Sequence, residues 1–272
     1  MTVEKGNGLM AHTQAPVSRE FGQVYAYFGH HKCASLWIRR VFEELSAGLG
    51  LKYVAYSSWL VFDPDEKPID QLYATDFLAA GLSLGARSFA FTDAHPRHVD
   101  LFPPGTRSFH VVRDPRDIVV SAYFSHLLSH DIDDFPALAR HRRQLAEISK
   151  EQGLYAVMDF LEPLFDDLRK WSQRPDVLEV KLEDLMADEV GGFTGILRFL
   201  GLLPQVGTER LAEVLDANSF SRMSGGRKPG VPDDGSHFRK GVAGDWRNHL
   251  TDDHLRYFLA RHADVLAKYS YL

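Results

Sequence analysis

The sequence contains only one cysteine, Cys33, among its 272 residues. A single cysteine excludes a disulfide within the chain and a cysteine-rich zinc site. No apolar run approaches the 18 residues of a membrane span, and residues 1–20 lack the apolar segment of a secretory signal. We therefore expect no membrane partner, and we expect a cytoplasmic protein.

The chain also has no excess of positive charge. It carries 31 Lys and Arg residues against 37 Asp and Glu residues, which gives a formal net charge of −6. A general nucleic-acid-binding protein is excluded, because binding to a phosphate backbone needs clustered positive charge. A small polyanion needs only a local basic site, so the positions of individual Arg and Lys residues are more informative than their total.

The order of apolar segments predicts an α/β fold. Runs at 24–28, 87–91, 108–112 and 177–180 are typical of buried strands. Residues 35–45, 117–128 and 191–202, and most of 137–174, have a helical pattern. Strands that alternate with helices favour a central parallel sheet flanked by helices. We expect one such domain over residues 21–272, preceded by a flexible lead-in at residues 1–20.

The first segment with chemical potential is the glycine-containing loop at 29–37, which reads GHHKCASLW. A loop between a strand and a helix directs backbone N–H groups of the helix N-terminus toward an anion. Lys32 and Ser35 lie in this loop, which is therefore P-loop-like, although the Walker pattern GxxxxGK[ST] is absent. Taken alone, the loop is equally consistent with a capped helix that carries a surface lysine.

The second segment, RDPRD at 113–117, follows a predicted strand. Arg113 lies at the carboxyl end of that strand, where open α/β sheets bind ligands, and Ser121 lies two turns into the next helix. A guanidinium fork with a nearby hydroxyl suits a phosphate monoester. The alternative is a strand-end arginine that pairs with Asp114 or Asp117.

The third segment, FRKGVAGDWRNH at 238–249, is locally basic. Between Arg222 and Arg247 there are six basic residues and three acidic ones, an excess of three positive charges in an acidic protein. The alternative is a solvated surface loop. The glycine- and proline-rich stretch before it, SGGRKPGVPDDGS at 224–236, is a predicted loop.

In order and wording, these three segments resemble the sulfotransferase family that uses 3′-phosphoadenosine 5′-phosphosulfate (PAPS). The first is similar to the family's 5′-phosphosulfate loop PKSGTTW, the second to its 3′-phosphate motif, and the third to its RKGxxGDWxNH segment. VKLEDL at 180–185 also resembles the family's YEDL stretch. The resemblance, over about residues 24–251, implies a P-loop-like nucleotide-binding core and a cytosolic-type, small-molecule sulfotransferase with PAPS as cosubstrate.

The resemblance implies a role for each matching residue. Lys32 takes the place of the lysine that contacts the transferring sulfonate, so its expected role is catalytic as well as binding. Arg113 and Ser121 take the 3′-phosphate positions, and Trp37 takes the place of the tryptophan against adenine. The other cofactor-binding positions lie in the first loop, near the adenine and over the 3′-phosphate: Cys33, Ala34, Ser35, Leu36, Asn218, Ser219, Phe220, Met223, Arg239, Lys240 and Gly241. Cys33, Ala34 and Leu36 depart from the family's Ser, Gly and Thr, so backbone N–H groups must contribute more to binding.

His95 is the general base that the resemblance indicates, because the family has a histidine after an early strand, often as KTHxP. The sequence here is TDAHP, so the family's lysine two positions before the histidine is replaced by Asp93, a candidate for orienting or charging the imidazole. His98 is the alternative base. A histidine with a pKa near neutrality suits removal of the acceptor's proton during in-line transfer. We expect no metal, because cationic side chains and the helix end neutralise the charge.

Two other functions fit parts of this pattern. A P-loop-type small-molecule kinase would need a hydroxyl residue after the lysine, and Cys33 fails that test. A non-catalytic relative that binds nucleotide or a protein partner is disfavoured by the presence of Lys32, Arg113, Ser121 and Arg239.

The acceptor is expected to be a small molecule, and an aromatic or lipophilic alcohol is one class that suits the aromatic residues between the first two motifs. These residues are Tyr53, Tyr56, Trp59, Phe62, Tyr73 and Phe77, and core packing is the alternative for them. The oligomeric state stays open: the family's dimer motif KxxxTVxxxE is broken at Asp252 and Arg256. Residues 224–236 are expected to be a mobile lid that nucleotide binding closes.

Overall fold

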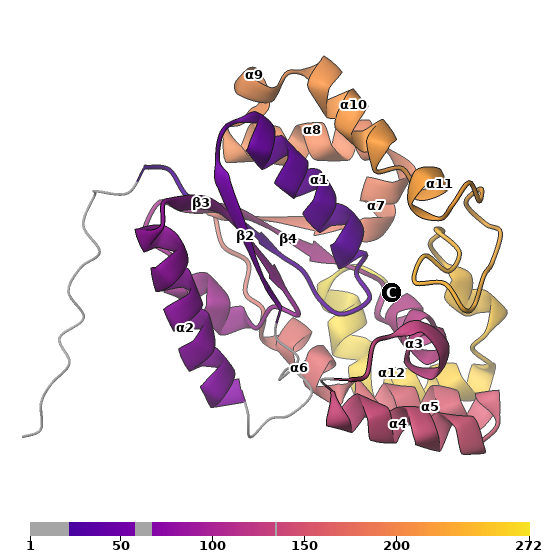
Figure 1. Ribbon diagram of the computed structural model, residues 1–272. Coiled ribbons are helices and arrows are strands. Elements are labelled where there is room, and N and C mark those ends of the chain that lie inside the picture. The colour runs from indigo at the N-terminus through magenta and orange to yellow at the C-terminus, as the bar shows by residue number, and fades with distance from the viewer. Residues whose placement is uncertain (1–21, 58–66, 134) are drawn as a thin grey trace, which may run out of the picture.

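A five-stranded parallel sheet forms the centre of the protein, whose computed structural model describes residues 22–57, 67–133 and 135–272 (Figure 1). The spatial order of the strands is β2-β3-β1-β4-β5, and every pairing is parallel. The strands are β1 (Tyr25–Phe28), β2 (Lys52–Ser57), β3 (Ala86–Thr92), β4 (Arg107–Val112) and β5 (Val177–Lys181). All carboxyl ends therefore lie at one edge of the sheet. The expected lead-in at residues 1–20 lies outside the described residues.

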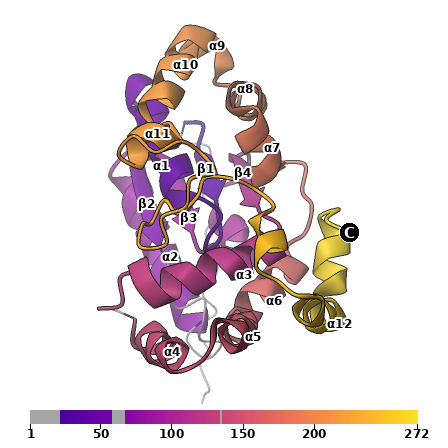
Figure 2. The same ribbon diagram turned by 90° about the vertical axis from the view of Figure 1, so that its right-hand side faces the viewer.

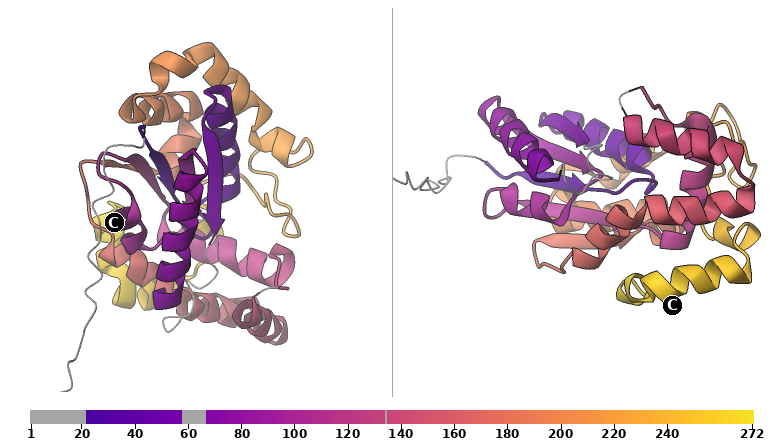
Figure 3. Two further views of the ribbon diagram at one scale, coloured as in Figure 1. Left: turned by 60° about the vertical axis from the view of Figure 1, so that its left-hand side comes forward. Right: turned by 90° about the horizontal axis from the view of Figure 1, so that it is seen from below.

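Helices cover both faces of the sheet, as the alternating pattern predicts (Figures 1 and 3). One face packs through a cluster that includes Tyr27, Ile38 and Phe193, and the other through a cluster that includes Phe28 and Leu78. The first face carries α1 (Ser35–Gly48), α7 (Leu182–Ala187), α8 (Glu189–Leu200), α9 (Leu203–Val206) and α10 (Thr208–Ala217). The second carries α2 (Lys67–Ser83) and a 3-10 helix at Pro96–Leu101.

The remaining helices form a separate layer beside the carboxyl edge of the sheet (Figure 2). This layer contains α3 (Pro115–Phe124), α4 (Pro136–Glu147), α5 (Lys150–Phe160), α6 (Glu162–Lys170) and α12 (Asp252–Lys268). Their apolar faces share a core with Ile118, Phe165 and Phe258 at its centre. Between α10 and α12 the chain forms α11 (Phe220–Met223), a long loop and a 3-10 helix at Asp245–Asn248.

Four of the strands were predictable from apolar runs, and the structure confirms them within two residues at each end. The strand β2 was not predicted, because its sequence KYVAYS is only partly buried and carries polar ends. The expected helix at 117–128 had the wrong bounds. It begins at Pro115, because the Asp114 side chain accepts a hydrogen bond from the backbone N–H of Arg116, and it changes to a π-helical turn at Ser125–Ser129.

The first loop follows β1, the strand at which the order of the strands reverses: β2 and β3 lie on one side of β1, and β4 and β5 lie on the other. β1 lies between β3 and β4, so the loops after these three strands converge at one edge. Gly29 begins the loop after β1, and a Cβ atom there would lie 2.2 Å from Tyr27 Oη, so only glycine fits. Within the described parts of the chain, no helix is both long and apolar enough to cross a membrane.

Candidate functional site

A cavity of about 610 Å³ lies where the loops after β1, β3 and β4 meet. Twelve of the residues expected to act in catalysis or cofactor binding line it, although they come from three distant parts of the sequence. They are Lys32, Ala34, Ser35, Leu36, Trp37, Arg113, Ser121, Phe220, Met223, Arg239, Lys240 and Gly241. The tertiary fold thus brings the three segments into a single site.

The first loop places Lys32 at the cavity. Lys32 and Ala34 have positive φ values of 64° and 55°, and Ala34 directly precedes α1. Ser35 Oγ donates to the carbonyl of His30 at 3.0 Å, which fixes the first turn of the helix. No described residue forms a hydrogen bond or ion pair with Lys32 Nζ. Burial, together with the charge of Arg113, lowers the pKa of Lys32 to about 7.

Arg113 supports the same loop from the end of β4. Its Nη1 donates to the carbonyl of Lys32 at 2.8 Å. The alternative pairing with Asp114 or Asp117 is wrong, because Asp114 binds Arg116 at 2.7 Å. Asp117 accepts from the backbone N–H groups of Gly244 and Trp246 at 2.6 and 2.9 Å. The rest of the Arg113 fork is therefore available to the cavity.

The third segment closes the cavity with two cations that already share a carboxylate. Arg239 and Lys240 both form ion pairs with Asp245. Asp245 is buried, but these cations and Asn248 hold its pKa below its usual range against the opposing effect of burial. Gly241 has φ 65°, and a Cβ atom there would lie 2.4 Å from the Phe220 ring. Asp245 thus positions the two cations before any anion binds.

The glycine- and proline-rich stretch at 224–236 contains neither helix nor strand, as predicted. Its Arg227 donates to the carbonyls of Val231 and Arg239, at 3.1 and 2.9 Å, and to Ser236 Oγ at 3.0 Å. The backbone N–H of Gly230 also donates to the carbonyl of Lys240 at 2.8 Å. The loop is therefore tied to the segment that carries Arg239 and Lys240, and its movement on nucleotide binding stays a prediction.

Three expected cofactor ligands lie outside the lining of the cavity. Cys33 is buried in the core beside Val112, and burial raises the pKa of its thiol to about 12. The Asn218 side chain donates to Glu44 Oε1 and to the carbonyl of Val214, both at 3.0 Å, and so closes the end of α10. Ser219 is the residue before α11. Any contact of these residues with a cofactor stays a prediction.

The two candidate bases also lie outside the lining, and each has both ring nitrogens directed at protein atoms. His95 Nδ1 accepts from the backbone N–H of Arg97 at 3.1 Å, and Nε2 lies 3.5 Å from Asp167 Oδ1. His98 is fully buried. Its Nδ1 accepts from the backbone N–H of His95 at 3.1 Å, and its Nε2 lies 2.9 Å from Asp70 Oδ2. His98 thus joins the turn after β3 to α2, and a role as base stays a prediction for either histidine.

Several titratable residues of the cavity were not predicted to contact a ligand, and for one of them, Asp93, the expected role was only to orient or charge the imidazole. His31, Asp93, His130 and His237 line it together with Lys32. Burial lowers the pKa of each histidine, and the charge of Lys32 adds to this effect, so the rings are neutral near pH 7. Burial raises the pKa of Asp93 to about 7. The replacement of the family's lysine by Asp93 was the one signal in the sequence for this acidic residue.

The described ranges contain no group of three or more His, Cys, Asp or Glu side chains arranged to hold a metal ion. The cavity instead offers cations and backbone N–H groups, which suit an anionic ligand. In addition, Trp37 Nε1 is buried without a hydrogen-bond partner and its ring lies 5.6 Å from Phe193.

Comparison with known proteins identifies a family and several proteins to which this chain is similar. The family model of the sulfotransferase domain matches residues 91–269, which is more than half of the chain. Sulfotransferase 2B1 of Homo sapiens is 27% identical over 162 residues, covering 55% of this chain and 41% of the relative. Sulfotransferase 2A6 of Mus musculus is 25% identical over 161 residues, covering 55% and 53%. The chain spans about half the length of the curated relatives it matches.

Two solved structures share the fold. The mouse sulfotransferase SULT7A1 complexed with PAP has a TM-score of 0.55 and 20% identity, and the match covers 92% of this chain and 88% of the other. A retinol dehydratase in complex with retinol and PAP has a TM-score of 0.53 and 19% identity, with 89% and 81% covered. At this level of identity the likeness establishes a common α/β architecture.

Proposed function

The chain belongs to the sulfotransferase domain family, and on that premise we propose that it transfers a sulfonate group from PAPS to a hydroxyl or amine of a small acceptor. The observation that carries the proposal is the convergence of Lys32, Arg113, Arg239 and Lys240 on one cavity. The protein as a whole has a net charge of −6, so four cationic side chains around one cavity form a local basic site, which is what a small polyanion needs.

The residues of the cavity fit a nucleotide that carries phosphate groups at both its 3′ and its 5′ position. Arg113, Ser121, Arg239 and Lys240 would hold the 3′-phosphate, since a guanidinium fork, a hydroxyl and an ammonium give charge-assisted hydrogen bonds. Ser35 and the backbone N–H groups at the start of α1 would hold the 5′ end. Trp37 lines the cavity, and a purine would stack on its ring.

In this proposal Lys32 acts on the transition state. Negative charge grows on the oxygen that bridges sulfur and the 5′-phosphate as the bond between them breaks. An ammonium with no protein partner can approach that oxygen without breaking an existing ion pair, and in a partly buried site its electrostatic effect is larger than in water. PAPS itself, as an anion, would raise the lowered pKa of Lys32 and keep it protonated.

The family resemblance gives the role of base to His95. In the described conformation its Nε2 is directed at Asp167 and its Nδ1 at the backbone of Arg97. The imidazole must therefore reorient before it can accept a proton from an acceptor in the cavity.

The acceptor belongs to the class of small hydroxyl or amino compounds. The aromatic residues at 53–77 give little support for an aromatic pocket: Tyr53 packs beside Phe42, Tyr56 and Phe77 pack on Phe91, and Tyr73 is exposed. Trp59 and Phe62 lie outside the described residues. Support for an alcohol comes from the retinol dehydratase of similar fold, which was solved in complex with retinol.

Transfer of ³⁵S from labelled PAPS to a panel of acceptors tests the proposal. The panel would contain 2-naphthol, a 3-hydroxysteroid, 1-hexanol and benzylamine. Labelled product with at least one acceptor is expected, and transfer of phosphate from ATP instead would indicate a kinase.

Thermal stability in the presence of 3′-phosphoadenosine 5′-phosphate (PAP) provides a second readout that needs no acceptor. At 100 times its Kd, PAP should stabilise the fold by about 2.7 kcal/mol. AMP lacks the 3′-phosphate and should have a much smaller effect at the same concentration. Equal shifts with PAP and AMP, or none with either, would contradict the proposed nucleotide site. Stabilisation by PAP without any transfer would indicate a non-catalytic relative.

A further inference from the structure

Asp93 is a carboxylate on the wall of the cavity, directly after β3. Its Oδ2 accepts a hydrogen bond of 3.3 Å from Ser57 Oγ, at the end of β2, and its Oδ1 lies 3.8 Å from His31 Nδ1. No lysine or arginine in the described ranges forms an ion pair with it. Its side chain keeps 18% of its surface exposed, so its oxygens have lone pairs available to a ligand in the cavity.

The order of the strands places Asp93 on the side of the cavity away from the expected 3′-phosphate. β3, β1 and β4 are neighbours in this order, so Asp93 after β3 and Arg113 after β4 lie on opposite sides of the loop that carries Lys32. Under the proposed function, Arg113 holds the 3′-phosphate and Lys32 acts on the bridging oxygen. In-line transfer requires the acceptor to attack sulfur from the side opposite to the leaving nucleotide. The acceptor therefore enters on the side of Lys32 that Asp93 lines.

Two other carboxylates line the cavity, and their positions differ from that of Asp93. Glu183 Oε1 accepts from the backbone N–H of Asp114 at 2.9 Å, and its Oε2 accepts from Tyr271 Oη at 2.6 Å. Glu189 begins α8, which follows β5 in the chain and contacts β4. Of the carboxylates that line the described part of the cavity, Asp93 is the one on the side of β3.

We infer that Asp93 selects acceptors that carry an ammonium group in addition to the hydroxyl that is sulfonated, so that amino alcohols and aminoalkyl phenols are preferred to neutral alcohols. This inference rests on the proposed function. The hydroxyl oxygen forms the bond to sulfur, its proton passes to the general base, which the proposed function assigns to His95, and the bridging oxygen leaves with PAP. The ammonium keeps its proton throughout and binds the Asp93 carboxylate, because a protonated nitrogen has no lone pair with which to attack sulfur.

The surroundings of Asp93 leave its negative charge incompletely compensated. Burial is the largest effect and raises the pKa of the carboxyl to about 7. The hydrogen bond from Ser57 and the charges of Lys32 and Arg39 oppose this effect, and the charge of Asp70 adds to it. The charged carboxylate is therefore less favourable here than in water, and a cation bound beside it would make it more favourable.

The protein itself provides little positive charge at Asp93 once the nucleotide is bound. His31 is neutral near pH 7, because burial lowers its pKa well below the usual value. The charge of Lys32 is then directed at the nucleotide. An ammonium of the acceptor supplies the missing charge and lowers the pKa of Asp93, so the pair forms a charge-assisted hydrogen bond at neutral pH.

Two pairs of acceptors of matched size test the inference with labelled PAPS. Tyramine and 4-propylphenol differ by an ammonium group in place of a methyl group, and so do 6-amino-1-hexanol and 1-heptanol. In at least one pair, wild type should favour the ammonium compound roughly 10- to 100-fold in kcat/KM, the range for a hydrogen bond to a charged partner. The difference should lie in KM, because the contact is made before the transition state. Equal use of both members of each pair, or preference for the neutral ones, would overturn the inference.

The variant Asp93→Asn tests whether Asp93 is the source of the preference. Asn keeps the shape, removes the charge and tolerates the φ of 58° at this position. The ratio of kcat/KM within a pair should fall to about threefold or less, because both members share the same nucleotide and base. Glu189→Gln is the matched control, since it removes a different carboxylate from the same cavity and should leave the ratio at its wild-type value. Loss of the preference in Glu189→Gln, with the preference retained in Asp93→Asn, would contradict the role of Asp93.

Binding of the same compounds to the complex with PAP separates this inference from the proposed function, because it needs no transfer. With PAP at saturation, calorimetry should show tyramine binding roughly 10- to 100-fold more tightly than 4-propylphenol, and Asp93→Asn should remove the difference. Sulfonate transfer with equal affinity for both compounds would overturn the inference and leave the proposed function standing. Absence of transfer to every acceptor, together with absence of PAP binding, would refute the proposed function itself.

Discussion

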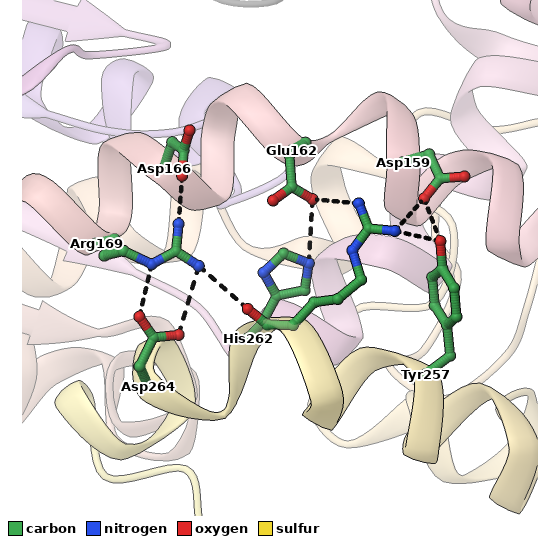
Figure 4. A network of polar contacts seen from close by, with 8 residues as sticks. Asp159, Glu162, Asp166, Arg169, Tyr257, His262 and Asp264 are labelled. Carbon is green, nitrogen blue, oxygen red and sulfur yellow. Dashed lines mark hydrogen bonds and ion pairs between the residues drawn. The ribbon is translucent and has the colours of Figure 1, made fainter.

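Charged side chains are used in opposite ways in two regions of this molecule. On the seam between α12 and the helices α5 and α6, two arginines each meet two carboxylates of the protein itself (Figure 4). Arg169 binds Asp264 at 2.6 Å and also pairs with Asp166, while Arg261 binds Asp159 at 3.0 Å and Glu162 at 3.1 Å. In the cavity, Lys32 forms no ion pair with any residue in the described ranges.

The two regions also differ in how deeply their charged side chains are buried. The seam residues are largely exposed, so their charges cost little to keep and their ion pairs add little stability. Lys32 and Asp93 are partly buried, and both have pKa values displaced toward the neutral form. A fold that retains such charges without pairing them loses stability, and a ligand of complementary charge restores it. Among the described residues, the charges without an ion pair therefore lie at the candidate site, whereas the paired ones lie at a contact between helices.

Removing the positive charge of Lys32 should have the largest effect on activity. Lys32→Met should lower the rate of sulfonate transfer 10²- to 10³-fold, the usual loss when one transition-state donor is removed. The same change should leave the free protein as stable as wild type or more stable, because a partly buried charge without a partner is lost. Transfer of ³⁵S and urea unfolding without ligand measure the two effects. A variant that is both active and destabilised would place Lys32 with the structural charges.

The second-largest effect is expected in the pH dependence of the free energy of unfolding, which should differ between the cavity and the seam. The pKa of Asp93 is raised from 3.8 to about 7 in the folded protein, so the unfolded state releases its proton first as the pH rises. The stability that protonated Asp93 contributes is complete below pH 3.8 and is lost between pH 3.8 and 7. Asp93→Asn should therefore make the free protein more stable than wild type at pH 7.5, by at most about 4 kcal/mol, with the gain shrinking toward pH 4.

The carboxylate of Asp264 on the seam serves as the matched control for this measurement. Its pKa is lowered by Arg169, so it stabilises the fold at neutral pH and loses that effect as the pH falls below its usual range. Asp264→Asn should accordingly be slightly less stable than wild type at pH 7.5. Urea titrations of both variants across this pH range would measure the two slopes, and slopes of the same sign would contradict the comparison.

The smallest effect on stability is expected from removing ion pairs of the seam. Arg169→Gln removes ion pairs to Asp166 and Asp264, and at this exposure the loss should be below about 1 kcal/mol, with sulfonate transfer unchanged. Arg256→Gln is the control, since Arg256 pairs with Asp253 within α12 and should have no measurable effect. Denaturant unfolding of both variants in low and high salt measures the difference. A large loss of transfer in Arg169→Gln would show that the seam and the cavity are coupled.

The sequence by itself determined the α/β class and the segments from which the site is built. Apolar runs located β1, β3, β4 and β5, because strands buried in a parallel sheet must be apolar throughout. The loop at 29–37, Arg113 with Ser121, and the 238–249 segment could be found because phosphate chemistry requires cations and hydroxyls next to strand and helix ends.

Only the tertiary structure decided which of these residues meet and which face the protein. Asn218 resembles a cofactor ligand in sequence, and in the fold its amide closes α10. His95 and His98 each have Nδ1 bound within the turn after β3, while their Nε2 atoms face Asp167 of α6 and Asp70 of α2. Asp93 gains its place beside Lys32 from the order of β1 and β3 and its raised pKa from burial. Side-chain direction and burial depend on contacts between segments far apart in the chain, and local sequence patterns do not record these contacts.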